Sequence, residues 1–168
     1  MWQLRKHLSS IRRDTRGAAI LEMTVILPVL LLIGLGVFEF GNLIYNYHLI
    51  TVGVRDAARY AAGLPEGSAD GKAKNIAVYG TTINTVAPRV SWWDETMVDV
   101  AYSYAANLAN SCTDGSGNPV KCYRGGDSIV LVTVSTDVPY QALGFLGFLK
   151  LGTITLHAQH EERLFGVR

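Results

Sequence analysis

Charged residues are scarce in this sequence and unevenly distributed. Only 17% of its 168 residues are charged, against about a quarter in typical soluble proteins. None of them lies between Met23 and Phe38. A deficit that is confined to one stretch indicates a membrane segment rather than an unusually apolar soluble domain. The length allows one domain with an appendage, rather than two enzyme-sized folds.

The sequence also lacks the residue patterns on which enzymes and metalloproteins depend. Asp114, Asp127 and Asp137 have no spacing that suggests paired acid–base catalysis, and no nucleophile constellation is present. His157 and His160 lie three residues apart in a predicted strand, so their side chains point to opposite faces and cannot bind one metal ion. We therefore predict no enzyme activity, no metal site and no cofactor. A membrane-anchored hydrolase is the least favoured alternative.

Cysteine is almost absent. The two cysteines, Cys112 and Cys122, enclose the turn-rich segment TDGSGNPVK. Two cysteines without a neighbouring histidine do not indicate a metal site. Outside the cytoplasm they would form a disulfide across the tip of a hairpin, whereas two free thiols are plausible only in a cytoplasmic domain.

What the sequence does contain is a basic leader followed by a long apolar run. Before Gly17 there are five basic residues and one acidic residue, a net charge of +4, so the rest of the chain carries −3 of the overall +1. The run AAILEMTVILPVLLLIGLGVFEF (18–40) is long enough for a spanning helix if Glu22 is tolerated. A basic cluster beside such a run predicts a cytoplasmic N-terminus. A nucleic-acid-binding patch is the rival explanation, but the rest of the chain is acidic, so we predict no nucleic-acid partner.

The spacing of apolar residues predicts that this helix continues beyond the membrane. A continuous helix from Ala18 to Ala62 would be about 68 Å long, and Leu64-Pro65 is the first firm stop. Apolar residues recur every three or four positions and so form one face of the helix. They are Phe40, Leu43, Ile44, Tyr47, Ile50, Val54, Ala57, Ala58 and Ala61. The residues expected largely on the other side are Asn42, Asn46, Arg55, Asp56 and Arg59.

The second half of the chain changes to a period of two. After a loop at 65–72 and a weakly helical stretch at 73–86, alternating sets begin at Val98, Val130 and Ile154. Pro139 ends the second set. We predict an α+β, pilin-like fold, in which an antiparallel sheet of three or four strands packs one face on the outer half of the helix. The predicted division is a cytoplasmic leader (1–17), a transmembrane helix (18–45), its periplasmic extension (46–64) and a periplasmic α+β domain (65–168).

The most specific signal is the junction between the leader and the apolar run. Glu22 lies five residues beyond Gly17 in an otherwise apolar helix. A carboxylate in a membrane helix costs about 2.5–3.5 kcal/mol even on the lenient insertion scale. A newly exposed α-amino group at Ala18, in the same chain or in a neighbouring subunit, would neutralise it. Alternatively, Glu22 lies near the cytoplasmic interface and reaches the headgroups.

This junction resembles the processing site of prepilins and pseudopilins, where a membrane aspartyl peptidase cuts immediately after the glycine. RGAAILEMTVILPVLLLIGLGVFEFGNLIY (16–45) and VRDAARYAA (54–62) are similar to the N-terminal signature of the TadE/TadG-like family of tight-adherence proteins. NIAVYG (75–80) and TITLHAQHEER (153–163) are similar to later segments of that family. The family's glutamate is commonly followed by an aromatic residue, and here Met23 follows Glu22, so cleavage is a hypothesis separate from the family resemblance.

The resemblance implies a single-pass protein of the bacterial inner membrane that acts by assembly, in adhesion and biofilm formation. The implied partners are a prepilin peptidase, other pilins and the platform proteins of a tight-adherence, Flp-type pilus system, in a homo- or hetero-oligomer. The alternative is an unprocessed, membrane-anchored adaptor that keeps its leader and binds a partner through its periplasmic domain.

Five residues of the long helix are candidates for an assembly interface: Glu22, Pro28, Glu39, Arg55 and Arg59. Transmembrane helices accept proline, because neighbouring helices and local adjustments compensate for it. Glu39 ends the apolar run and is most simply a solvated boundary residue. Arg55 and Arg59 are most simply part of a solvated helix face, with Asp56 close enough to Arg59 to interact weakly.

Alkaline-phosphatase fusions test the predicted topology. A fusion after Val138 is expected to be active, because the positive-inside rule puts everything after the apolar run outside the cytoplasm. The measurement is phosphatase activity of intact cells. An inactive fusion would contradict the periplasmic placement of the C-terminal domain.

Overall fold

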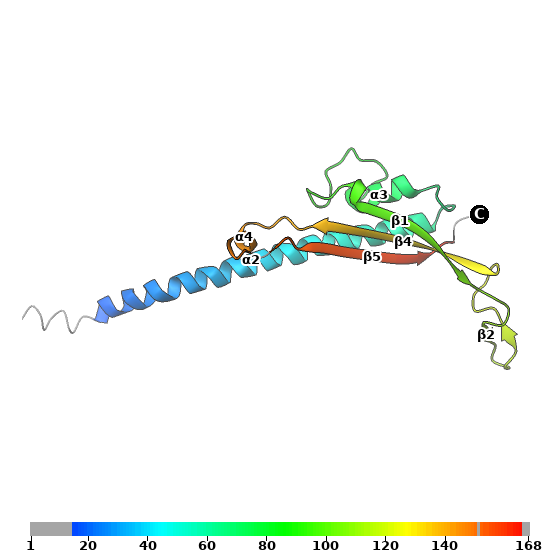
Figure 1. Cartoon of the computed structure of the whole chain (residues 1–168), viewed down its shortest axis with the longest axis horizontal. Helices are drawn as coiled ribbons and strands as arrows, with labels where there is room; N and C mark the ends of the chain where they lie inside the picture. Colours follow the sequence, from blue (N-terminus) through cyan, green and yellow to red (C-terminus); the bar gives the residue numbers. More distant parts are fainter. Residues whose placement is uncertain (1–14, 151, 166–168) are drawn as a thin grey trace, which may run out of the picture.

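The computed structural model describes residues 15–150 and 152–165, so residues 1–14 of the predicted leader lie outside the described part. The helices are α2 (Thr15–Ala62), α3 (Asp70–Tyr79), the 3-10 helix η1 (Glu95–Met97) and α4 (Phe145–Phe148). The strands are β1 (Val98–Ala106), β2 (Cys112–Thr113), β3 (Pro119–Val120), β4 (Ser128–Pro139) and β5 (Thr155–Arg163). The predicted fold class is confirmed: a long N-terminal helix precedes a domain with a small antiparallel sheet (Figure 1).

Helix α2 is continuous over 48 residues, with Pro28 inside it. It ends at Ala62, where the N–H groups of Gly63 and Leu64 turn back to carbonyls of the last turn. Because Pro65 disfavours helix in the residue before it, the helix cannot continue. Figure 1 shows that the N-terminal half of α2 projects from the molecule, whereas its C-terminal half lies along the domain.

Three strands form the main sheet, in the order β1-β4-β5, and all pairs are antiparallel. The central strand β4 pairs Thr136 with Val98 of β1 and Val138 with Leu156 of β5. Its side chains alternate, so that every second residue from Val130 to Val138 is buried. Strands β4 and β5 contact α2, and β1 contacts α3. The predicted packing of one sheet face on the outer half of the helix is therefore confirmed.

Small residues bring α2 and α3 close together under the sheet. A Cβ atom added at Gly53 of α2 would lie 2.3 Å from the carbonyl oxygen of Ala77 in α3 and 2.9 Å from the ring of Trp93. The Trp93 side chain is buried, and its Nε1–H donates to Oγ1 of Thr136 in β4 (3.1 Å). Gly53 thus permits a contact in which two helices and the sheet share one core.

The face of α2 that meets the domain changes at about Ile50. From Ile50 to Ala61 the predicted apolar face is buried. Before Ile50 the prediction holds only for Leu43, which is half-buried against the core. The domain also covers the polar side of the helix there: Asn46 is 7% exposed, and Asn42 is half-buried. The apolar residues that remain exposed instead are Phe40, Ile44 and Tyr47. The burial is tolerated because Nδ2 of Asn46 donates to the Asn42 carbonyl one turn earlier (2.7 Å).

Gly53→Ala tests the close approach of α2 and α3. The added methyl group has no space, so we expect the free energy of unfolding to fall by about 1–3 kcal/mol, even though alanine favours a helix by about 1 kcal/mol. Urea unfolding of the full chain in detergent, followed by tryptophan fluorescence, measures it. Gly71→Ala in α3 is the matched control, since nothing lies within 4 Å of its added Cβ. Equal stability of the two variants would contradict the described packing.

Candidate functional site

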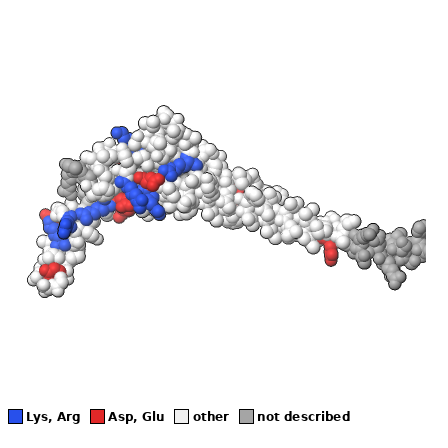
Figure 2. Space-filling view, turned by 180° about the vertical axis from the view of Figure 1, so that it is seen from behind, with Lys and Arg blue, Asp and Glu red and all other residues white. Residues whose placement is uncertain are grey.

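The N-terminal half of α2 is an uncovered apolar helix. Large apolar side chains are exposed along its length, from Ile20 to Phe40. The helix is long and apolar enough to cross a membrane, and the window that qualifies it is not buried by any other part of the described chain. Figure 2 shows almost no charged group on this projecting half, whereas basic groups gather over the domain. An exposed apolar surface of this size marks a membrane or protein interaction site.

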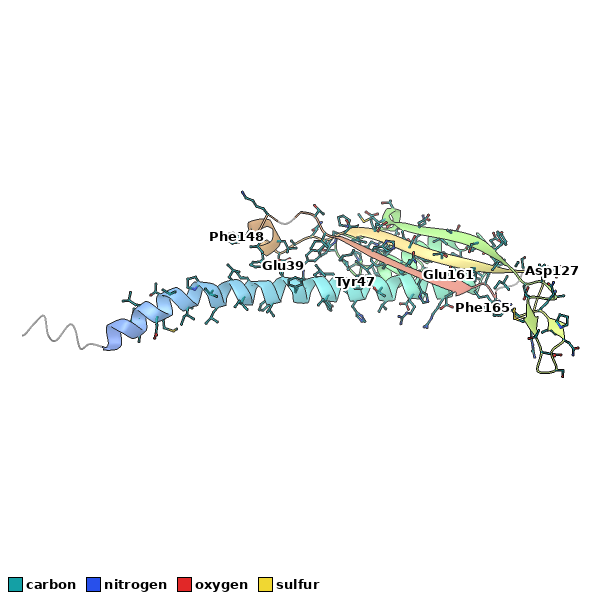
Figure 3. All side chains as sticks on the ribbon, turned by 60° about the horizontal axis from the view of Figure 1, so that its bottom comes forward. Glu39, Tyr47, Asp127, Phe148, Glu161 and Phe165 are labelled. Atoms are coloured by element: carbon teal, nitrogen blue, oxygen red, sulfur yellow. A yellow bond between two sulfur atoms is a disulfide. The ribbon has the colours of Figure 1, made fainter. Side chains whose placement is uncertain are left out.

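Glu39 lies where the domain first covers α2. Its side chain is 2% exposed. The Tyr140 hydroxyl and the backbone N–H of Leu143 donate to its Oε1 (2.9 and 3.0 Å), and the N–H of Phe145 donates to its Oε2 (3.3 Å). The expectation of a solvated boundary residue is wrong, because donors from the chain segment after β4 replace water around the carboxylate. Figure 3 shows Glu39 on α2 next to that segment.

Tyr140 completes this junction from the end of β4. Its side chain is buried, and its hydroxyl accepts a hydrogen bond from Nδ2 of Asn42 (2.8 Å) while it donates to Glu39. Burial raises the pKa of Tyr140, so the hydroxyl keeps the proton that it donates. The Trp92 ring packs edge-on against the tyrosine, with 6.2 Å between ring centroids. We call Glu39, Asn42, Tyr140 and the N–H groups of residues 143 and 145 the Glu39 junction.

The segment after β4 (residues 141–150) folds back onto the apolar half of α2. Gly144 has φ of 127°, which a residue with a side chain rarely adopts, and it forms the turn that leads into α4. The Phe145 ring lies against Gly36, where an added Cβ would be 3.4 Å from it. A cavity of about 550 Å³ lies between the segment and the helix. Its lining residues are Pro28, Leu31, Leu32, Leu35, Leu143, Gly144, Phe145 and Phe148.

The residues predicted for processing lie far from this junction. Because α2 begins at Thr15, the bond between Gly17 and Ala18 lies in its first turn. Glu22 is exposed about one turn further along. At 1.5 Å per residue, Glu22 and Glu39 are about 25 Å apart along the helix, so they do not form one site.

Of the remaining assembly candidates, Pro28 lies in the exposed N-terminal half of α2, whereas Arg55 and Arg59 lie on the part that runs along the domain. Arg55 and Arg59 are exposed, as predicted for a solvated face. Asp56, however, pairs with Nη2 of Arg89 (2.8 Å), and Nε of Arg59 lies 3.7 Å from Oε1 of Glu162 in β5. Asp56 and Arg59 therefore each pair with the domain. Such partly exposed ion pairs contribute at most about 1 kcal/mol each.

The predicted disulfide between Cys112 and Cys122 is present, and it closes the hairpin of β2 and β3. Figure 1 shows this hairpin projecting from the end of the domain. Its base is held by Asn107, which sequence reasoning missed. Nδ2 of Asn107 donates to the carbonyls of Tyr123 (2.8 Å) and Gly126 (3.0 Å), and its Oδ1 accepts from the N–H of Tyr123 (3.0 Å). These hydrogen bonds join residues 16 to 19 positions apart on either side of the hairpin, so a local sequence pattern could not predict them.

The histidines and aspartates that were weighed as catalytic or metal-binding groups are dispersed. His157 and His160 lie at positions of opposite parity in β5, and their partners are Asp137 and Glu162. Within residues 15–150 and 152–165, no group of three or more histidine, cysteine, aspartate or glutamate side chains is arranged to hold a metal ion. Asp114 lies in the disulfide hairpin with Asn118, and Asp127 pairs with Lys121.

Comparison with known proteins gives a family match for the N-terminal region of the chain. The family model described as TadE-like protein matches residues 17–59, which confirms the predicted family resemblance. The matched range includes Gly17, Glu22, Pro28, Glu39 and Arg59, and it ends before α3 and the sheet. It suggests a component related to tight-adherence pili. Comparison with curated proteins gives no match, and comparison with solved structures gives none.

Glu39→Ala tests the junction. The substitution removes the acceptor of three donor groups, and hydrogen bonds to a charged group contribute about 1.5–3 kcal/mol, so we expect a loss of stability of that order. We also expect residues 141–150 to become sensitive to chymotrypsin, which cuts after aromatic residues. Mass spectrometry of timed digests measures this. The control is Glu161→Ala, which removes an exposed carboxylate of β5. Identical digestion of both variants would show that Glu39 does not hold the segment.

Proposed function

We propose that this protein is a pilin-like component of a tight-adherence, Flp-type pilus assembly and secretion system, and that it acts by assembly rather than by catalysis. The TadE-like match over residues 17–59 supports this proposal. The observation that carries it is the division of α2: the N-terminal half exposes apolar side chains, and the domain covers the C-terminal half. Such a helix needs lipid while it is anchored, and it needs other apolar subunits when it leaves the lipid.

In this proposal, α2 crosses the inner membrane with its N-terminus in the cytoplasm. At 1.5 Å per residue, Ala18 and Glu39 are about 32 Å apart, close to the ~30 Å thickness of the hydrocarbon core. The exposed side chains of Tyr45 and Tyr47 follow within about 12 Å, at the headgroup level where aromatic residues are enriched. The basic residues before Gly17 remain on the cytoplasmic side.

The disulfide supports the same orientation. The bond between Cys112 and Cys122 persists in an oxidising compartment, and the periplasm is one. The domain that carries it then lies outside the cytoplasm. The division into a leader (1–17), a transmembrane helix (18–45), its extension (46–64) and a periplasmic domain (65–168) belongs to this proposal.

In this proposal, assembly depends on cleavage of the leader and on pairing of Glu22 with the new N-terminus. A prepilin peptidase would cleave the bond after Gly17 and create an α-amino group at Ala18. Glu22 lies one turn further along the helix, within reach of that group in the same chain or in an adjacent subunit. Pairing neutralises a carboxylate that is otherwise expensive in lipid, and pairing between subunits fixes their axial register.

The exposure of the other predicted assembly residues decides which of them can contact a neighbouring subunit. Pro28 lies on the bare half of α2, and Arg55 lies exposed beside the domain. Arg59 is also largely exposed, although it pairs with Glu162 of its own chain. These three are the residues that other pilins or platform proteins would contact in a homo- or hetero-oligomer. Glu39 is occupied inside its own chain. Its contribution to assembly is therefore indirect, since it positions the domain on the helix. Adhesion and biofilm formation would follow from the assembled pilus.

N-terminal sequencing tests the proposal. The protein is purified from membranes and from sheared surface material, in a host that carries its own prepilin peptidase. We expect the mature protein to begin at Ala18, because cleavage follows Gly17. An intact leader in both fractions would contradict a filament subunit and would favour the unprocessed adaptor.

Glu22→Gln separates processing from assembly. We expect the mature N-terminus to be unchanged. The amount in the sheared fraction should fall about tenfold or more, the effect of losing an interaction of about 1.4 kcal/mol. Glu161→Gln is the control, because Glu161 is exposed on β5. Wild-type amounts of the Glu22→Gln variant in surface material would overturn the role of the glutamate in assembly.

A further inference from the structure

The segment 141–150 exposes large apolar side chains from a fixed position. Phe148 is 75% exposed, Leu143 is 66% exposed and Leu149 is 43% exposed. No charged residue lies between Asp137 and Lys150. Exposed side chains of this kind, gathered in one short segment, mark a contact surface rather than an ordinary solvent loop.

The segment lies alongside the part of α2 that has the composition of a membrane span. The Phe145 ring packs on Gly36, and the cavity beneath the segment is walled by Leu31, Leu32 and Leu35 of the helix. Figure 3 shows Phe148 on the N-terminal side of Glu39, over the apolar half of α2. The exposed surface of the segment is thus continuous with the exposed surface of the helix.

The depth of this contact follows from the length of the helix. At 1.5 Å per residue, Leu31 and Leu35 lie about 20 and 26 Å from Ala18, in the outer part of a hydrocarbon core that is ~30 Å thick. Glu39 lies at the outer boundary of that core. Anything packed on Leu31–Leu35 is therefore at the depth of the acyl chains of the outer leaflet.

We propose that residues 141–150 are a second membrane-contacting element, inserted into the outer leaflet beside α2, with lipid acyl chains covering Leu143, Phe148 and Leu149. This inference rests on the membrane crossing of α2 proposed above. The exposed Lys150 ends the inserted segment, and its long side chain reaches back to the phosphate groups of the lipid. The protein then contacts the membrane through one spanning helix and one inserted turn.

Half of the backbone N–H groups of the segment have hydrogen-bond partners inside the protein, which favours burial in lipid for the part from Leu143 to Lys150. Backbone polar groups inside a bilayer must find partners within the protein. The N–H groups of Leu143 and Phe145 donate to Glu39. Those of residues 148, 149 and 150 donate to the carbonyls of residues 144, 145 and 147. Glu39 is in turn enclosed by donors, so its carboxylate is not left bare to lipid.

Spin-label accessibility tests the insertion on the full chain in liposomes of phosphatidylethanolamine and phosphatidylglycerol. A nitroxide is attached to Phe148→Cys, and in a second variant to Leu143→Cys, with the Cys112–Cys122 disulfide left intact. Leu32→Cys on the bare helix is the lipid reference, and Ser116→Cys in the disulfide hairpin is the water reference. We expect the Phe148 label to collide with oxygen as the Leu32 label does, and with a polar nickel chelate several-fold less than the Ser116 label does.

Three results would overturn the proposal, and they are distinguishable. If the labels at Phe148 and Leu143 contact nickel as Ser116 does while Leu32 is protected, the segment lies in water and the crossing of α2 stands. If the same labels contact neither oxygen nor nickel, protein covers the segment, and a second copy of the chain is the occupant. If Leu32 itself contacts nickel, α2 does not cross the membrane, and the proposed function fails with the insertion.

Discussion

Hydrogen bonds to one buried carboxylate join the two parts of this molecule. Glu39 of α2 accepts from Tyr140, Leu143 and Phe145, which all belong to the chain segment that follows the central strand. A buried carboxylate without such donors is strongly unfavourable. A shift of the domain by one helical turn, about 5.4 Å, would separate the carboxylate from these donors and would also break the close packing at Gly53. The junction therefore fixes where on α2 the domain begins.

The position of the domain decides which part of α2 is available for function. On one side of the Glu39 junction, close packing at Gly53 and the buried ring of Trp93 bind the helix to the sheet as one body. On the other side the helix is bare, and its length matches the hydrocarbon core of a membrane. The segment that carries Phe148 is part of the domain in sequence, because it joins β4 to β5. In space, however, it packs against the bare half of α2. The helix, the domain and the turn that carries Phe148 thus have fixed positions relative to one another, which the proposed assembly role requires.

Local patterns predicted the elements but not the junction. The alternation in β1, β4 and β5, the stop at Leu64-Pro65 and the pairing of Cys112 with Cys122 are local signals, and the structure contains all three features. The hydrogen-bond partners of Glu39 lie about a hundred residues away in sequence. The residues around Glu39 in the sequence therefore do not indicate that it is buried. Between Glu39 and Tyr47 the helix carries a polar face and an apolar face. The rule that apolar residues lie inside holds for Leu43 but fails for Asn42 and Asn46, because buried polar side chains are tolerated where they find hydrogen-bond partners. In the proposed membrane position, the exposed apolar face turns to lipid.

The most direct test of this account is a double-mutant cycle between Glu39 and Tyr140. The free energy of unfolding is measured by urea titration of the full chain in detergent for Glu39→Ala, Tyr140→Phe and the double variant. Residues that share a hydrogen-bond network show a coupling of about 0.5–3 kcal/mol, and we predict a value in that range. Additive effects of the two substitutions, within about 0.3 kcal/mol, would contradict the claim that this contact fastens the domain to the helix.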